Sequence, residues 1–257
     1  MQKFINQLLD LPKMVNDKLP KNCFNEMMDN SEGSIKNWTG FAFKVGALVL
    51  LVVTLISVIN IGIEAIQDAD GLGKASAIVC LALLVYAAFP IAHVVRSAGD
   101  SLAGSKSKTV DFIFKDFVTA NIKALGHITA LVALFGAICS TVGWVLNSDG
   151  MSISVDLYGG FAYAYALPID ATATFMEMVS LDFVGGFIND FFEWDLTGSE
   201  ASGYNIEGAV AVGWEYVQVI LILAKLYFAL ALYHFFYGIL STLFKWLQSP
   251  YLPFKSS

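Results

Sequence analysis

The chain of 257 residues is 56% hydrophobic and only 14% charged, and its mean hydropathy is +0.64. Because a soluble globular domain carries about 25% charged residues, this composition excludes an ordinary soluble domain and predicts an integral membrane protein. The net charge of −7 says little about partners, since the acidic residues are concentrated in one segment, and no nucleic-acid partner is predicted. The three cysteines lack metal-ligand spacing, so we expect neither a metal site nor a disulfide framework.

Residues 1–40 form a polar arm with five lysines. Its charged region is too long for a cleavable signal peptide, and no small-residue cleavage site follows a short apolar core. Within the arm, apolar residues recur on one side of a helix before Pro12, which predicts a short helix in the membrane interface. These residues are Phe4, Ile5, Leu8 and Leu9.

Four apolar segments are long enough to cross about 30 Å of hydrocarbon as helices. They cover residues 41–66, 75–95, 128–146 and 217–244. The predicted fold class is therefore an all-α integral membrane protein with four transmembrane helices. Its parts are the arm 1–40, a transmembrane domain 41–247 and a tail 248–257.

Polar residues recur along the first segment at helical spacing, so they are expected on one side of the helix. Such a stripe should face protein or water, and it can serve interhelical hydrogen bonding or a solute pathway. The candidates are Thr54, Ser57, Asn60 and Glu64, followed by Asp68.

The loop between the second and third segments predicts a further amphipathic helix over 110–125, which continues into the third segment. Its apolar side carries Val110, Ile113, Phe114, Phe117 and Leu125.

Small residues form ridges on the third and fourth segments, where they allow close helix contacts within the chain or between copies. The third carries Ala133, Gly136, Ser140 and Gly143, and the fourth carries Ala224, Ala231 and Gly238.

The stretch 147–213 has ten acidic residues and no basic one, whereas lysines gather in the arm, the second loop and the tail. By the positive-inside rule both termini are cytoplasmic and this acidic loop is extracytoplasmic. A bacterial inner membrane is the expected location, because no transit peptide is visible.

The acidic loop also holds eleven aromatic residues between 148 and 208, which is unlike a disordered linker. We predict two short helices, N-capped by Asp170 and Asp182, in an ordered cap over 148–208 that packs on the outer ends of the spans. An exposed aromatic patch could instead dock a partner. The candidates for docking are Phe187, Phe191, Phe192 and Trp194.

Lys225 lies inside the fourth apolar segment, about 7 Å outward of the segment's midpoint at Leu230. Its ammonium group can snorkel toward the headgroups or pair with a carboxylate, for which Glu64 is the candidate. A transport role is the third interpretation.

His93, His127 and His234 fall on three different predicted helices, so haem ligation has to be considered. Interface and packing roles are the preferred explanation, because three histidines are a small sample and His93 and His127 lie near the interface, and no cofactor is predicted.

Three functions are compatible with the sequence. The first is a non-catalytic scaffold or accessory subunit, with the lipid bilayer and other membrane-protein subunits or further copies as partners. A channel or transporter that uses the polar face and Lys225 is the alternative, and a haem-binding redox subunit is the remote one.

Overall fold

The computed structural model describes residues 24–148, 173–174, 176–178, 180, 182–193 and 204–248. Four long helices carry the fold: α3 (Phe24–Asp68), α4 (Leu72–Ala103), α6 (Val118–Val145) and α9 (Ile206–Gln248). A short α5 (Thr109–Asp111) and a π-helical turn η1 (Phe112–Phe117) precede α6, and α8 (Asp182–Glu193) precedes α9. No strand occurs among these residues.

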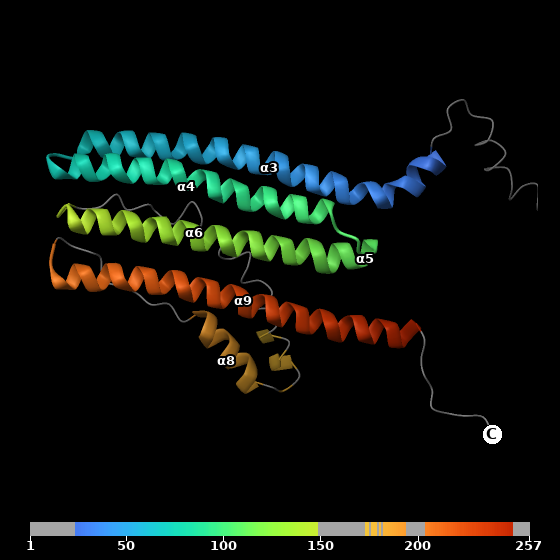
Figure 1. Cartoon of the computed structure of the whole chain (residues 1–257). Coiled ribbons are helices and arrows are strands. Elements are labelled where there is room, and N and C mark those ends of the chain that lie inside the picture. The colour runs from blue at the N-terminus through green and yellow to red at the C-terminus, as the bar shows by residue number, and fades with distance from the viewer. Residues whose placement is uncertain are drawn as a thin grey trace, which may run out of the picture.

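The four long helices lie side by side in one row, in chain order (Figure 1). α4 packs on α3, α6 on α4 and α9 on α6, so α3 and α9 form the two edges. The α3–α4 hairpin closes through a three-residue turn, in which Gly71 takes a φ of 56° that an L side chain rarely adopts. We call the end of the row that carries this turn the hairpin end.

The opposite end of the row is named the basic end. It carries Lys36 of α3, Lys106 and Lys108 of the loop after α4, Lys115 of η1 and Lys123 near the start of α6.

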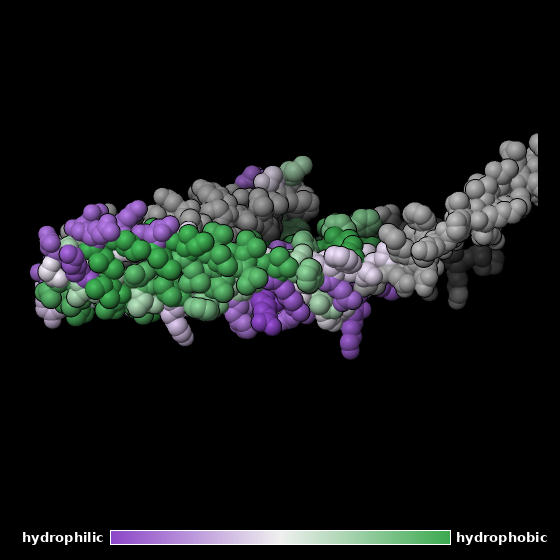
Figure 2. All heavy atoms as spheres, turned by 90° about the horizontal axis from the view of Figure 1, so that it is seen from above, coloured by the Kyte–Doolittle hydropathy of each residue, from purple (hydrophilic) through white to green (hydrophobic). Residues whose placement is uncertain are grey.

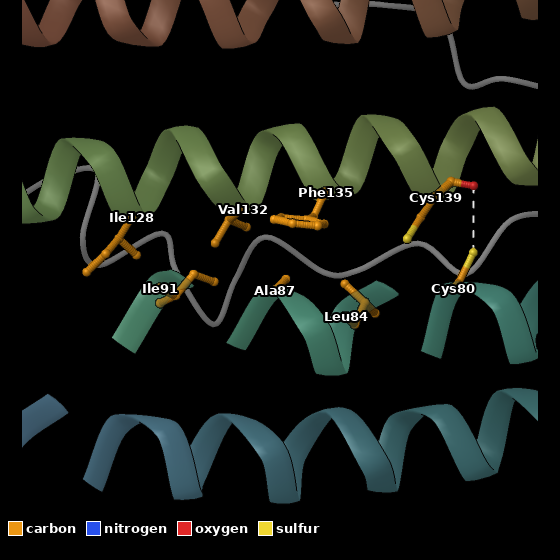
Figure 3. Close-up of a cluster of buried hydrophobic side chains, with 8 residues drawn as sticks. All are labelled: Cys80, Leu84, Ala87, Ile91, Ile128, Val132, Phe135 and Cys139. Carbon is orange, nitrogen blue, oxygen red and sulfur yellow. Dashed lines mark hydrogen bonds between the residues drawn. The ribbon is translucent and has the colours of Figure 1, made fainter. Parts of the chain in front are cut away.

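The contact between α4 and α6 is an apolar seam with heptad-like spacing (Figure 3). Both helices place buried side chains at intervals of four, three and four residues, as in coiled-coil packing. At one end of the seam the Cys80 thiol donates to the carbonyl oxygen of Cys139 at 3.7 Å. The seam consists of Cys80, Leu84, Ala87 and Ile91 against Ile128, Val132, Phe135 and Cys139.

The contact between α3 and α4 is built from small residues. A Cβ on Gly40 would lie 2.7 Å from both the Cβ of Ala103 and the carbonyl oxygen of Gly99. Nearby, Lys44 and Asp100 form an ion pair at 2.8 Å. Among the α3 side chains that the structure describes, the buried ones are Gly40, Ala47, Thr54 and Gly62, and their small size lets the two backbones approach closely.

All four predicted spans are confirmed as helices that are long and apolar enough to cross a membrane. The helices run past the predicted apolar limits, because backbone hydrogen bonding continues into polar residues at both ends. The predicted helix over 110–125 is present and continues into α6 as one helical stretch, Thr109–Val145. The predicted arm helix lies outside the described residues.

The second predicted loop helix is confirmed as α8. Asp182 is the first residue of this helix rather than the N-cap before it. Of the first predicted loop helix, residues 173–174 and 176–178 are helical, while Asp170 lies outside the described residues.

The position of α8 differs from the predicted cap. Ile188 of α8 packs with Ala173 and Ala229, beside Phe228 and Leu232 of α9. Ala229 is about 35 Å along α9 from its first residue, so α8 lies far from the hairpin end rather than over it. Ile188 is the residue of α8 that packs on α9, while Phe183 and Phe187 are exposed; Figure 1 shows α8 beside the middle part of α9.

Candidate functional site at the basic end

The polar stripe of α3 does not face a single environment. Thr54 is buried at 3% exposure, Ser57 is half-buried, and Asn60 and Glu64 are exposed. At 3.6 residues per turn these four positions spread over about 120° of the helix surface. One edge of the stripe therefore turns toward α4, while the other edge turns away from the row.

The structure does not bring Lys225 and Glu64 together. Lys225 is buried at 8% exposure, and the next residue, Leu226, packs on Gly126 of α6. Glu64 is four residues from the hairpin end of α3. Gly126 is 19 residues from the last residue of α6, which lies at the hairpin end. The two charges are therefore separated by about 20 Å or more in the direction of the helix axes.

The predicted small-residue ridges are only partly at helix contacts. On α6, Gly143 is buried and Ala133, Gly136 and Ser140 are half-buried, but a Cβ on Gly136 would meet nothing within 4 Å. On α9, Ala224, Ala231 and Gly238 are all exposed. The ridge on α9 therefore makes no close contact among the described helices.

The three histidines are not gathered into one site. His93 and His234 are exposed, and His127 packs edge-on against Tyr227 with its Nδ1 2.6 Å from the carbonyl oxygen of Lys123. Within the described residues no group of three or more His, Cys, Asp or Glu side chains could hold a metal ion.

Among the docking candidates, Phe187 is 58% exposed on α8, and it is not part of the cluster in which Ile188 packs on α9. Phe191 and Phe192 belong to α8, but their side chains lie outside the described part of the structure, as does Trp194.

A polar cluster that sequence reasoning missed lies at the basic end. The Lys36 ammonium of α3 donates to the carbonyl oxygens of Ser105 at 3.2 Å and Ser107 at 2.5 Å. The same ammonium lies 5.9 Å from the centre of the Phe112 ring. Because a lysine binds two backbone carbonyls of one loop, α3 fixes the connection between α4 and η1.

Side chains of the loop and of α9 hold η1 in turn. The Ser105 hydroxyl donates to the Asp116 carboxylate and accepts the backbone N–H of Ser107 at 3.2 Å. From α9, the Tyr237 hydroxyl donates to the Asp111 carboxylate and the Tyr233 hydroxyl donates to the carbonyl oxygen of Phe114. π-helical turns occur frequently at functional sites, and this one is fixed from two sides.

The cluster borders an open pocket of 510 Å³. Its lining is dominated by hydroxyl and charged side chains: Ser101, Ser105, Ser107, Lys106, Asp116, Thr119 and Lys123, with Leu102 and Ala120 at the base. The sequence signal that could have revealed it is the run GSKSK directly before the amphipathic stretch, 104–108.

The chain matches no protein-family model, no curated protein and no solved structure. Its class therefore follows from the helices alone: an all-α, multi-pass membrane protein with four candidate spans.

Proposed function

We propose that the protein is a non-catalytic scaffold or accessory subunit of a membrane complex, and that the α3 edge of the row contacts another transmembrane helix. The observation that carries the proposal is Asn60. Its side chain is exposed on α3 beside Ile56, Ile59 and Ile63, each more than 40% exposed, and the exposed Glu64 follows one turn nearer the hairpin end.

Asn60 is eight residues from the end of α3, which places it about 12 Å inside the helical row from the hairpin end. No described residue of the chain offers its side chain a hydrogen bond. An amide in hydrocarbon is stabilised by a partner on a neighbouring helix, by about 1 kcal/mol. Figure 2 shows the α3 edge as a continuous hydrophobic band, so a helix could pack along it.

An open row also supports a contact role over transport. The two edges, α3 and α9, each pack on one long helix only, and the polar stripe divides between the α4 contact and the outer face. A solute pathway needs polar side chains from several helices directed into one lumen.

Purification of the full chain from its native membranes in mild detergent tests the proposal. A copurifying subunit or a second copy is expected by mass analysis, and Asn60→Leu should reduce its recovery. Thr242→Val on α9 is the matched control, because the exposed Thr242 hydroxyl already donates to the carbonyl oxygen of Gly238 at 2.8 Å. A monodisperse monomer for the unsubstituted chain would refute the scaffold proposal.

We further propose that the basic end faces the cytoplasm of a bacterial cell, with both termini on that side. Among the described lysines, only Lys74 lies at the hairpin end, and the positive-inside rule favours this side as the one outside the cytoplasm. In a chain without its native cysteines, an impermeant thiol reagent applied to intact cells should label Lys74→Cys and spare Lys108→Cys. The reverse pattern would invert the orientation.

A further inference from the structure

We propose that the pocket at the basic end binds a phosphate-bearing anion, with the headgroup of an anionic phospholipid as its natural source. The pocket combines two lysines, Lys106 from the loop and Lys123 from α6, with serine and threonine hydroxyls. Ammonium groups are strong donors to phosphate oxygens, and their hydrogen bonds to an ionised acceptor are about twice as strong as neutral ones.

The two lysines are available to a ligand, because both are exposed and neither forms an ion pair within the described residues. The Lys36 ammonium adds positive charge behind the loop, since its hydrogen bonds go to neutral carbonyls. One carboxylate, Asp116, also lines the pocket, and it already accepts the Ser105 hydroxyl. Cations therefore outnumber carboxylates around the pocket.

The walls of the pocket are fixed before any ligand binds. Lys36 holds the loop through two carbonyls, and the Ser105–Asp116 hydrogen bond joins the loop to η1. The Thr119 hydroxyl is likewise fixed, because it donates to the carbonyl oxygen of Lys115 at 2.7 Å. A preorganised site loses less ordering entropy on binding than a mobile loop would.

The surroundings favour a lipid over a free phosphate. η1 carries exposed apolar side chains beside the pocket-lining Asp116, among them Ile113 at 40% and Phe114 at 58% exposure. The same helix then continues as a candidate span, Thr109–Val145. A polar pocket at the start of an apolar span can bind a phosphate while the acyl chains lie along the helix.

The test uses the full chain in neutral detergent, titrated with short-chain phosphatidylglycerol, with phosphatidylcholine of the same chain length, or with inorganic phosphate against chloride at equal ionic strength. Native mass spectrometry counts the bound molecules, and melting curves confirm that each variant is folded. Lys106→Gln and Lys123→Gln should each weaken phosphatidylglycerol binding about five-fold, the effect of one lysine near a phosphate surface.

The matched controls are Lys108→Gln, an exposed lysine of the same loop that does not line the pocket, and Lys74→Gln at the hairpin end. Saturable binding of phosphatidylglycerol that only the pocket variants weaken supports the lipid source. Saturable binding of inorganic phosphate with the same variant dependence, and no added affinity for the lipid, assigns the site to a free phosphate. The proposal is overturned if neither binds saturably, or if Lys108→Gln weakens binding as much as Lys106→Gln.

Discussion

Gly126 provides a sharp test of how α6 packs on α9. A Cβ added at Gly126 would lie 2.7 Å from Cδ2 and 2.8 Å from Cγ of Leu226. Ordinary carbon–carbon contacts lie at about 3.5–4.0 Å, so Leu226 would have to move by about 1 Å. It has no free space for this movement, because Leu226 is fully buried and packs with Ile122 and Leu230.

The magnitude follows from two opposing effects of Gly126→Ala. Overpacking a well-packed contact costs about 1–3 kcal/mol, while replacing a glycine inside a helix by alanine stabilises it by up to about 1 kcal/mol. At Gly136, in the same helix, an added Cβ meets nothing within 4 Å, so only the favourable effect remains. Gly126→Ala should therefore be less stable than Gly136→Ala by about 1–3 kcal/mol.

Reversible unfolding in mixed detergent micelles measures this difference between the two variants. Adding Leu226→Ala to Gly126→Ala should remove the clash, so the combined loss should be smaller than the sum of the single losses by about 1–3 kcal/mol. If Gly126→Ala is at least as stable as Gly136→Ala, Leu226 does not pack on this glycine and the register of α6 against α9 is wrong.

Three further predictions concern the other contacts of the row. Gly99→Ala should destabilise the protein more than Gly126→Ala, because its Cβ would lie 2.8 Å from the backbone carbonyl oxygen of Gly40, which cannot rotate away. Gly46→Ala is the control, because a Cβ there has open space. Equal melting temperatures for Gly99→Ala and Gly126→Ala would contradict the prediction. Lys225→Met and Glu64→Gln should change the free energy of unfolding additively, within about 0.5 kcal/mol, and a larger coupling would show that the two side chains interact. In a chain without native cysteines, Ile188→Cys should cross-link on oxidation to Ala229→Cys and not to Val212→Cys. The opposite result would show that α8 packs near the hairpin end.

The presence of the four spans could be predicted because it depends only on the length and composition of apolar runs. The fine structure of their contacts could not. Gly126 and Gly136 are the same residue type in the same helix, yet one faces Leu226 and the other faces open space. Which glycine is at a contact depends on the neighbouring helix and its register, and neither is encoded in the local pattern.

The stripe on α3 shows the same limit. Its residues share one side of the helix at the precision of a helical wheel, but a stripe about 120° wide is broad enough to straddle a contact. Thr54 is therefore buried while Asn60 is exposed. The pocket at the basic end was missed for a related reason, since it is assembled from α4, a loop, η1 and α6 and has no motif within one segment.

The position of Lys225 shows how register decides the interpretation of a charge. Measured along α9 alone, it lies outward of the midpoint, which is why Glu64 was the candidate partner. However, α9 spans 43 residues, about 64 Å, so its own midpoint need not coincide with the middle of the row. Because Leu226 packs on Gly126, Lys225 lies about one helical turn from the level of Lys123. The register of α9 against α6, and not the place of Lys225 within α9, therefore decides its neighbours, and it separates Lys225 from Glu64 along the helix axes.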